Sequence, residues 1–467
     1  MKNFYYQPGP AGSGKTYQLS HWAVEKTLAH EKVLIAQPTK ELIRETIRAI
    51  RAINPDIAVK QITGTTTTSR VTHQIVQHMA AAAPHAGEIL IISHDALKRL
   101  PTGMRKFWHL VCDEIPNVLE HIDLYIAKTH RHITDHMDAS QDIADDLIGL
   151  RIGNRAGLEA VQANSSKDQN IGTFNRLVNT LLSGEHLVSI TRTQWTDLLT
   201  NPDHTGNVDF FAVLLSGFVE GYRTTTFMGA NIEQTELYLV WSALLDVAWT
   251  LHPEMGGKLR YQSHGNGARL SIGYLFDSRL SKRFLSKDDE EGETVFTKVT
   301  DYVARFWDGV PFLWQANKDA MPGGFEYDAR LPGVSHGLDK AHWKRFHNVA
   351  LLSALNRKSA AYGFLSRIGV DEYAAQASLS WQNDYQAMMR CSLRAPEAIA
   401  PVRVIVGSKA GAEWLADKFP GCVVEKMETS IAEPGKSGRP AMTGDTKPMT
   451  GAERVRLSRA RKKAGAA

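Results

Sequence analysis

The sequence predicts an α/β protein in which two domains, each built on a parallel β-sheet, follow one another along the chain. Two observations carry this prediction. Short, continuous apolar runs are interleaved with helical segments near the N-terminus, and the same alternation resumes in the second half of the chain. Strands that are buried on both faces lack the polar alternation of a half-exposed sheet, so such runs indicate parallel strands covered by helices on both sides.

The first 115 residues carry strand and helix signals at βαβ spacing. We expect strands at Phe4–Gln7, Lys32–Ala36, Ile57–Ile62, Glu88–Ile92 and Leu110–Cys112. We expect helices at Lys15–Ala29, Lys40–Ile53 and Ser69–Ala82. The pair Asn54-Pro55 ends the second of these helices, because proline disfavours helical geometry in the residue before it.

Between Pro116 and about Ser216 the residue pattern changes: strand signals disappear and polar stretches with helical character take their place. We expect helices there at Ser140–Ile152, Thr173–Leu182 and Gln194–Leu199. Strand signals resume at Tyr222–Met228, Leu270–Leu275, Pro311–Trp314, Val349–Leu352 and Val402–Val406. The sequence therefore predicts a first domain at 1–235 with a helical insertion at about 116–216, a second domain at 236–426, and a disordered basic tail at 427–467.

Charge is unevenly distributed along the chain. From Glu433 onward there are nine Lys or Arg and three Asp or Glu, which leaves 45 basic and 47 acidic residues in the body. The tail thus resembles an appended basic arm. The three cysteines lack metal-ligand spacing, and no apolar stretch approaches the ~18–20 residues of a membrane span. No signal peptide fits, so we expect a cytoplasmic protein without a membrane partner.

A glycine-rich motif follows the first predicted strand. Residues 9–16 read Gly-Pro-Ala-Gly-Ser-Gly-Lys-Thr and match G-x-x-x-x-G-K-[ST] in full. Glycines let the backbone curl so that successive N–H groups point at nucleotide phosphates, at the positive end of the following helix. Lys15 is expected to reach the β- and γ-phosphates of ATP and Thr16 to bind Mg²⁺. The predicted nucleotide-binding residues are Gly9, Gly12, Ser13, Gly14, Lys15 and Thr16.

Two carboxylates end the fifth predicted strand. Asp113 and Glu114 directly follow the apolar run Leu110–Cys112. In phosphate-loop enzymes, an acid at this strand end holds Mg²⁺ together with the loop threonine. We expect Asp113 to bind the metal and Glu114 to act as the general base that deprotonates the attacking water. Two acids after a strand are otherwise usual at the start of a solvated loop, and the phosphate-loop context favours the catalytic interpretation.

The spacing of these two motifs resembles that of superfamily 2 helicases, whose Asp-Glu box here reads Asp113-Glu-Ile-Pro. The resemblance implies two tandem RecA-like P-loop domains that bind ATP and Mg²⁺ and track a nucleic-acid strand. Two segments after predicted strands resemble motifs that grip the strand backbone, and their residues are Pro38, Thr39, Lys40, Ser93 and His94. The segment Met228–Asn231 stands where the family has a Ser-Ala-Thr motif that couples hydrolysis to strand binding; its candidate residues are Gly229, Ala230 and Asn231.

Two later segments resemble motifs of the second helicase domain. Gly337 and Asp339 belong to a Gly-Leu-Asp sequence that resembles a second coupling motif. Gln386, Arg390 and Arg394 are spaced four residues apart and resemble the Gln/Arg motif that supplies arginine fingers. If Trp381–Leu393 is helical, the three side chains share one face and two guanidinium groups can neutralise charge at a γ-phosphate. The alternative is a solvated basic face that makes surface pairs.

The C-terminal tail carries a second candidate nucleic-acid contact. Gly438-Arg439-Pro440 resembles the core of minor-groove arms. The run Glu453–Lys463 adds a basic cluster whose arginines are Arg454, Arg456, Arg459 and Arg461. Such a segment binds phosphates by releasing counterions, independently of base sequence. The alternative is a disordered tail that only promotes solubility.

Several features depart from the family pattern. We expect no adenine-reading glutamine motif of the DEAD-box kind upstream of Gly9, and the spacing of the Gln/Arg motif is looser than usual. The overall likeness is to divergent helicases of phages and plasmids. The leading hypothesis is therefore an ATP hydrolase of the helicase or translocase type that moves on single-stranded or tailed duplex DNA, in preference to RNA. It would act with replication proteins in a bacterial or phage-infected cytoplasm.

Two alternatives keep the nucleotide site and change the activity. In the first alternative, the protein is a nucleic-acid-stimulated ATPase switch that does not unwind strands. In the other alternative it is a DNA-binding replication accessory, in which the tail binds DNA and the phosphate loop only senses nucleotide.

Overall fold

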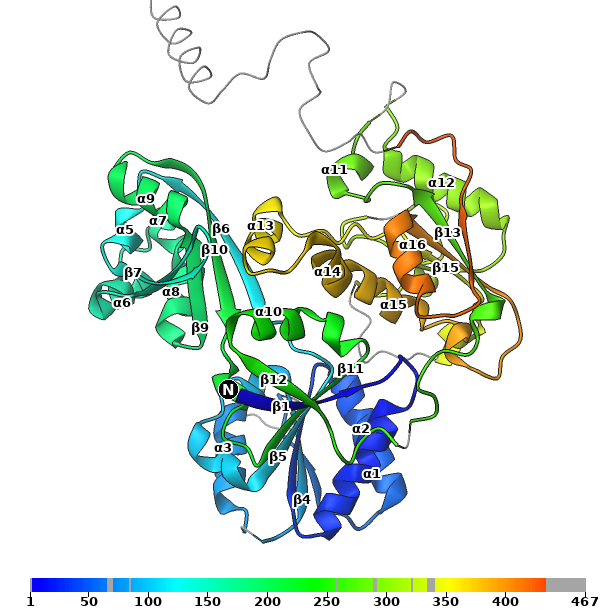
Figure 1. The fold of residues 1–467 in the computed structure, drawn as a ribbon, viewed down its shortest axis with the longest axis horizontal. Coiled ribbons are helices and arrows are strands. Elements are labelled where there is room, and N and C mark those ends of the chain that lie inside the picture. The colour runs from blue at the N-terminus through cyan, green and yellow to red at the C-terminus, as the bar shows by residue number, and fades with distance from the viewer. Residues whose placement is uncertain are drawn as a thin grey trace, which may run out of the picture. The chain divides into compact units, whose positions relative to one another are not determined.

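The computed structural model describes residues 2–64, 70–83, 85–257, 259–288, 292–320, 322–333 and 341–433. One compact unit spans Met1–Ala432, and Glu433–Ala467 form a second unit. Within the described residues, two parallel sheets and one antiparallel sheet carry the first unit (Figure 1). This confirms the predicted α/β class with two parallel-sheet, RecA-like domains. The predicted basic tail lies outside the described residues apart from its first positions.

The first sheet has seven parallel strands in the order β12-β1-β11-β5-β2-β4-β3. Their bounds are β12 Val247–Leu251, β1 Lys2–Pro8, β11 Thr224–Gly229, β5 Trp108–Asp113, β2 Lys32–Gln37, β4 Glu88–Ser93 and β3 Val59–Gln61. Strands β2 and β5 are fully buried along their length, and their middle residues are the apolar runs that the sequence predicted. Strand β12 was not predicted, and it extends the sheet past residue 235, where the sequence analysis ended the first domain.

Helices cover both faces of this sheet. Figure 1 shows α1 (Lys15–Leu28) and α2 (Lys40–Ile53) on one face and α3 (Val71–Ala81) on the other. The two faces form separate apolar cores, one containing Leu19 and Ile43 and the other containing Ile75. Short helices α4 (His94–Leu97) and η1 (Thr102–Phe107) lead from β4 to β5, and η2 (Ser216–Val219), η3 (Ile232–Gln234) and α10 (Glu236–Leu244) flank β11.

The insertion in the first domain is present, but the expectation that it is helical is wrong. It holds a five-stranded antiparallel sheet in the order β6-β10-β9-β8-β7. The segment expected as a helix at Ser140–Ile152 forms most of the hairpin of β7 and β8. Strand β7 is an edge strand whose residues are mostly exposed, so its sequence carries no apolar run to mark it.

The elements of the insertion have the following bounds. The strands are β6 Leu119–Ala127, β7 Met137–Ala144, β8 Leu147–Ile152, β9 His186–Thr191 and β10 Thr205–Leu214. The helices are α5 Arg131–Thr134, α6 Arg155–Ala163, α7 Gln169–Gly172, α8 Asn175–Ser183 and α9 Arg192–Thr200. The two helices expected at Thr173–Leu182 and Gln194–Leu199 are therefore confirmed as α8 and α9.

The third sheet is parallel and has the order β14-β15-β16-β13-β17. Its strands are β14 Leu313–Gln315, β15 Asn348–Leu351, β16 Val402–Ser408, β13 Leu270–Phe276 and β17 Val423–Lys426. The helices in this half of the chain are α11 Lys282–Leu285, α12 Val295–Trp307, α13 Ser359–Arg367, α14 Glu372–Gln376, α15 Gln382–Met388 and α16 Lys409–Ala416. Of these, α13 packs on β10 of the insertion. A π-helical segment, η7 (Ala377–Trp381), joins α14 to α15, and short 3₁₀ turns are η4 Gly267–Arg269, η5 Tyr327–Ala329, η6 Ala341–Arg345 and η8 Ser392–Arg394.

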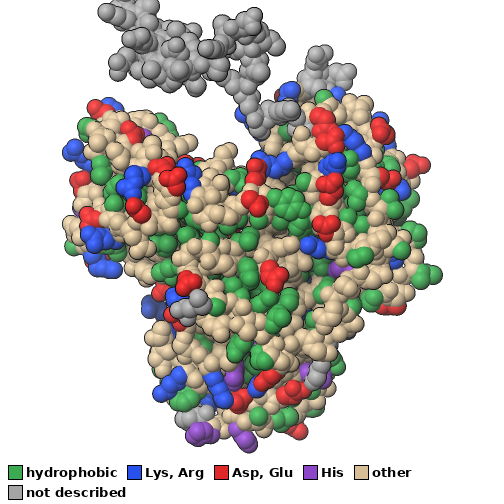
Figure 2. All heavy atoms as spheres, in the orientation of Figure 1, with side chains coloured by type: hydrophobic (Ala, Val, Ile, Leu, Met, Phe, Trp, Pro, Cys, Tyr) green, Lys and Arg blue, Asp and Glu red, His purple; other side chains and the backbone are tan. Residues whose placement is uncertain are grey.

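The surface of the described residues is mixed in charge. On the face drawn in Figure 2, Lys and Arg side chains are interspersed with Asp and Glu and do not merge into one large basic patch. This agrees with the near balance of 45 basic and 47 acidic residues in the body of the chain. Among the residues that the structure describes, no helix combines the length and the apolar content needed to cross a membrane.

Candidate active site between the two parallel sheets

The glycine-rich motif forms the loop between β1 and α1. Gly12 and Gly14 have φ angles of 83° and 90°, in the left-handed region that a residue with a Cβ seldom adopts. Ser13 N–H donates to the Pro10 carbonyl at 3.1 Å, which closes the turn. The helix begins at Lys15, so the free N–H groups of its first turn face the space beside the loop. This is the geometry that binds phosphate.

Lys15 is buried beneath its own loop. Its Nζ donates to the carbonyls of Gly9 and Pro10 at 2.9 and 3.1 Å. Burial lowers the pKa of the Lys15 ammonium, while the carboxylates of Glu114 and Asp113 act in the opposite direction. A buried ammonium with two carbonyl partners can exchange them for phosphate oxygens, which are stronger acceptors for a cation.

Asp113 ends β5 and faces the loop threonine. Thr16 Oγ1 donates to Asp113 Oδ2 at 3.5 Å, and Gln37 Nε2 donates to the same oxygen at 2.7 Å. Burial and, second, the neighbouring Glu114 raise the pKa of Asp113 to about 6, against the hydrogen bond from Gln37. A hydroxyl and a buried carboxylate that face each other fit the oxygen ligands that Mg²⁺ prefers.

Gln37 begins the segment Gln37–Lys40 that resembles a strand-gripping motif, and its place beside Asp113 was not predicted. It is the last residue of β2, which is the hydrogen-bonded neighbour of β5 in the sheet. The carboxyl ends of parallel neighbours meet at one edge, so a polar residue at the end of β2 was available as a signal. Thr46 fixes the Gln37 amide further, since Gln37 Nε2 also lies 2.7 Å from Thr46 Oγ1.

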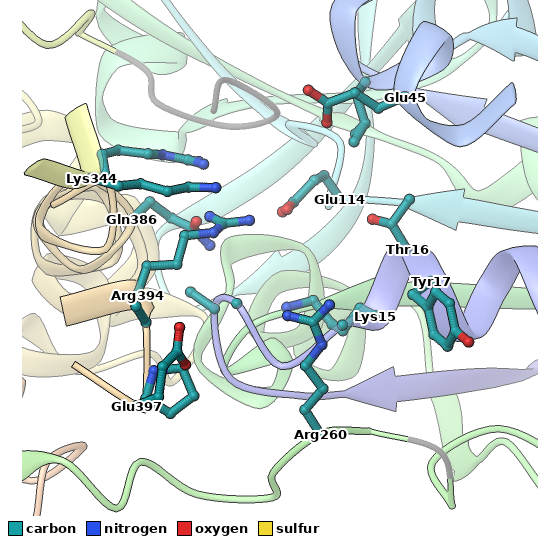
Figure 3. A pocket seen from close by; sticks show the side chains of 17 residues that line it. Lys15, Thr16, Tyr17, Glu45, Glu114, Arg260, Lys344, Gln386, Arg394 and Glu397 are labelled. Carbon is teal, nitrogen blue, oxygen red and sulfur yellow. The ribbon is translucent and has the colours of Figure 1, made fainter. Parts of the chain in front are cut away.

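Glu114 has a strained backbone. Its φ angle is 69°, which is uncommon for a residue other than glycine, asparagine or aspartate. Its N–H donates to the Met228 carbonyl of β11 at 3.0 Å, and this bond holds the conformation. Glu114 lines the cavity beside the loop, and Figure 3 shows its carboxylate pointing into that cavity. Strain of this kind persists where the surrounding structure imposes it, and it is common at catalytic residues.

The second wall of the cavity comes from the other parallel-sheet domain. The cavity has a volume of about 400 Å³ and joins the loop to Gln386, Arg390 and Arg394 (Figure 3). The structure therefore brings the three predicted residues next to Lys15, Thr16 and Glu114. Further lining residues that the sequence analysis did not single out are Tyr17, Glu45, Arg260, Lys344 and Glu397. They belong to no spaced motif, so no sequence signal marked them.

The expectation that one helix face carries the three residues is wrong. Helix α15 ends at Met388, so Arg390 lies in the following turn and Arg394 lies in η8. Cys391, beyond the end of α15, is extended, with φ −80° and ψ −170°, so helical geometry does not continue to Arg394. The turn is held instead by tertiary hydrogen bonds, such as that from Ser392 N–H to the Phe346 carbonyl at 2.9 Å.

The predicted coupling segment lies against α15. Asn231 Nδ2 donates to Gln382 Oε1 at 3.3 Å, and Gln382 Nε2 donates to the Asn231 carbonyl at 3.2 Å. Ala230 is buried in the core of the third sheet, although it follows a strand of the first. A Cβ on Gly229 would lie 3.0 Å from Ile115 Cγ1. Gly337 and Asp339 lie outside the described residues.

The predicted strand-gripping residues cap two helices at the same edge of the first sheet. The hydroxyls of Thr39 and Ser93 cap α2 and α4, and Pro38 and Lys40 are exposed. His94 Nε2 lies 3.2 Å from the Ala36 carbonyl, and burial lowers the pKa of this histidine to about 4. None of these five residues is among those described as lining the cavity. Arg439, Arg454, Arg456, Arg459 and Arg461 lie outside the described residues.

A phosphate loop, paired acids and arginines that meet between two parallel sheets define a nucleotide-hydrolysing enzyme of the RecA-like class. Residues 6–144 match the family described as DEAD/DEAH box helicase. The matched segment runs from the phosphate loop past the Asp-Glu box, so the chain carries an ATP-hydrolysing domain of the helicase type. The match covers less than a third of the chain.

Comparisons over the whole chain are weaker. No curated protein matches it. A structure of a Dbp5 variant of S. cerevisiae, bound to RNA and ADP BeF3, has 9% identity, covers 91% of this chain and 85% of that one, and has a TM-score of 0.33. The DUF1998 helicase MrfA bound to DNA has 11% identity, coverages of 91% and 50%, and a TM-score of 0.35. T4 UvsW has 10% identity, coverages of 91% and 73%, and a TM-score of 0.22. Scores this low establish neither a shared substrate nor a shared activity.

Proposed function

We propose that this protein hydrolyses ATP to drive movement along, or unwinding of, a nucleic acid, with DNA as the preferred substrate. One observation carries the proposal. The phosphate loop and Glu114 of the first domain share a cavity with Gln386, Arg390 and Arg394 of the second domain. A nucleotide bound there touches both domains, so its hydrolysis changes the contact between them. That is the requirement for a motor that alternates its grip on a strand.

The roles of the residues follow from their places around the cavity. Lys15 would bind the β- and γ-phosphates, and Thr16 and Asp113 would hold Mg²⁺, which when bound neutralises phosphate charge. Glu114 would take a proton from the attacking water as the oxygen–phosphorus bond to the leaving ADP breaks and inorganic phosphate forms. Arg390 and Arg394 would stabilise the charge that develops on the γ-phosphoryl oxygens, and Gln386 would orient the water.

The nucleic acid would lie across the edge of the first sheet that carries Thr39 and Ser93. Support for this path is the shared position of the two helix N-termini, whose N–H groups favour anionic phosphate. The lowered pKa of His94 means that it would contribute hydrogen bonds rather than charge. The preference for DNA is supported by the sequence Gly438-Arg439-Pro440 in the tail. We place the activity in phage or plasmid replication on the likeness of its motifs to divergent helicases.

The test measures ATP turnover with single-stranded DNA, duplex DNA and RNA side by side. We expect the largest stimulation with single-stranded DNA. We also expect Lys15→Ala and Glu114→Gln to abolish the stimulated turnover while the fold is retained, as shown by thermal melting. Strand-stimulated turnover in either variant would refute the site. Turnover without displacement of a strand from a tailed duplex would support an ATPase switch in place of a helicase.

A further inference from the structure

Side chains from the second half of the chain hold the backbone of the phosphate loop. Ala11 N–H donates to the hydroxyl oxygen of Tyr385 at 2.8 Å, and Tyr385 precedes Gln386 on α15. The hydroxyl of Tyr261 donates to the Ala11 carbonyl at 2.8 Å. Tyr261 belongs to the segment that joins β12 to β13, so two elements outside the loop occupy both polar backbone groups of one loop residue.

A buried histidine sets the direction of these hydrogen bonds. His264 Nε2 lies 2.7 Å from the hydroxyl of Tyr385. That oxygen already accepts from Ala11 N–H, so its own proton is available to donate to a neutral imidazole nitrogen. Burial lowers the pKa of His264 to about 4, which keeps the ring neutral, and the ring stacks on Phe419 with centroids 4.2 Å apart. The chain of bonds therefore runs from the loop amide through Tyr385 to His264.

The same joining segment also holds the turn that precedes Arg394. Asn266 Nδ2 donates to the Leu393 carbonyl at 2.8 Å, and the Arg269 guanidinium donates to the Ser392 carbonyl. At its other end, Arg260 N–H donates to the Ser13 carbonyl of the phosphate loop at 2.9 Å. One short segment thus bonds to the loop and to the arginine turn together.

Gly12 shows how closely the two parts approach. A Cβ at this position would lie 2.7 Å from Tyr261 Oη and 3.2 Å from Arg394 Cγ. The first distance is shorter than a Cβ allows, so the tyrosine hydroxyl occupies the space that any side chain would need. The loop, the tyrosine and the arginine therefore form one packed contact.

We propose that Tyr261, Tyr385 and His264 are positioning residues that couple the conformation of the phosphate loop to the placement of Arg390 and Arg394. This inference rests on the proposed ATPase site and adds residues to it. The three side chains act through Ala11 and not on the nucleotide. The N–H of Ala11 already donates to Tyr385, so it is not available to a phosphate. Phosphate is left to the later N–H groups of the loop and to Lys15.

The expected effect separates hydrolysis from nucleotide binding. Tyr385→Phe keeps the ring and removes the hydroxyl, which leaves the buried Ala11 N–H without its partner. ADP affinity depends on the loop and Lys15, so we expect it to change less than about threefold. Turnover requires the arginines to close on the same loop, so we expect kcat to fall by about tenfold or more.

The experiment compares Tyr385→Phe, Tyr261→Phe and the double variant in the full-length protein. It measures kcat, KM for ATP, the affinity of a fluorescent ADP, and the melting temperature. Because both hydroxyls hold the same residue, the double variant should lose little more than the stronger single variant. Tyr373→Phe is the matched control, since this tyrosine lies on the neighbouring α14 and is half exposed. His264→Gln, which retains an acceptor, should keep more turnover than His264→Ala.

Three results would overturn the inference. One is a kcat for Tyr385→Phe within twofold of the unaltered protein. Another is a fall in kcat that is matched by the loss of ADP affinity or by melting at the assay temperature, which would indicate a purely structural role. The third is hydrogen exchange at the Ala11 amide that does not accelerate in Tyr385→Phe, because loss of its acceptor should speed this exchange. This exchange tests the contact without hydrolysis, so an unaltered protein that fails to hydrolyse ATP would refute the proposed function alone.

Discussion

The two walls of the nucleotide cavity are built in different ways. The first wall uses strand ends. The phosphate loop starts where β1 stops, and Asp113 is the last residue of β5. The second wall uses a turn after a helix, in which Arg390 and Arg394 follow the end of α15. Parallel strands fix the first wall through their register, whereas hydrogen bonds from distant segments fix the second.

Because the two walls are built differently, we expect the first to determine nucleotide binding and the second to determine turnover. Strand ends meet at one edge of the sheet whenever the sheet forms, so the binding residues of the first wall are set by folding itself. The arginine turn depends on contacts to the segment between β12 and β13, including those of Asn266 and Arg269. Changes in the second wall should therefore alter turnover with less effect on binding or on stability.

The largest test of this comparison removes an arginine. We expect Arg394→Ala to lower kcat by about 10³-fold, the usual contribution of an arginine that stabilises phosphoryl transfer. ADP affinity and melting temperature should change little, because the first wall remains intact. Arg403→Ala on β16 provides the control, since that half-exposed arginine lies in the same domain and pairs with Glu425. Equal losses in the two variants would contradict the assignment.

A second test concerns the stability of the helix that leads to the arginine turn. Asp384 on α15 is buried, and burial raises its pKa from 3.8 to about 8. The folded protein therefore keeps a proton that the unfolded chain releases above about pH 4, and stability falls as the pH rises from about 4 to 8. We expect Asp384→Asn to stabilise the protein at pH 8.5 by several kcal/mol and to have little effect near pH 4. Thermal melts at both pH values measure this.

The exposed Asp301 on α12 supplies the comparison for that measurement. Asp301→Asn makes the same chemical change at an exposed position, so the effect of Asp384→Asn is compared with it at both pH values. A pH-independent effect of Asp384→Asn would show that the buried carboxyl is not the cause of the slope.

A third test disrupts the contact of Gly12 in the first wall with Tyr261 and Arg394. Gly12→Ala places a Cβ 2.7 Å from Tyr261 Oη at a φ angle of 83°. Left-handed backbone costs about 1–2 kcal/mol for a residue with a Cβ, and the displaced tyrosine adds to this cost. The backbone cost lowers stability, whereas displacement of Tyr261 disturbs the loop, so we expect kcat to fall by about tenfold. Gly184 has a φ angle of 67° and nothing within 4 Å, so Gly184→Ala carries the backbone strain without the contact. Similar turnover in the two variants would show that the contact has no role.

The difference between the two walls also explains which parts of the fold and of the site could be predicted from the sequence. Helix α2 was predicted with the bounds that the structure shows, because Thr39 caps it and Asn54-Pro55 ends it. The phosphate loop and Asp113-Glu114 could be singled out in the sequence because their spacing is local. Strand β12 was missed because its short segment is only partly buried, and the antiparallel insertion was mistaken for helices because its edge strand is polar.

Contacts between segments that are distant in the sequence could not be predicted from local patterns. Gln386, Arg390 and Arg394 were singled out by their spacing and line one cavity with the loop, but the prediction that they share a helix face was wrong. Tyr261 and Tyr385 belong to no spaced pattern, and only the folded chain brings their hydroxyls to Ala11. Local signals therefore identified the first wall and some residues of the second, but not the bonds that join the two walls.

The smallest predicted effect separates two roles of the segment after β2. Thr39 Oγ1 accepts from Leu42 N–H at 3.2 Å and caps α2, so Thr39→Ala should cost about 1 kcal/mol of stability. Lys40 is exposed, so Lys40→Ala should leave the melting temperature unchanged and weaken stimulation by single-stranded DNA. Thr39→Ser, which retains the hydroxyl, should restore stability. Stimulation is measured at two salt concentrations, because a phosphate contact weakens as salt rises. If Lys40→Ala kept full stimulation at both, the nucleic-acid path would not cross this edge, and the first wall would serve the nucleotide alone.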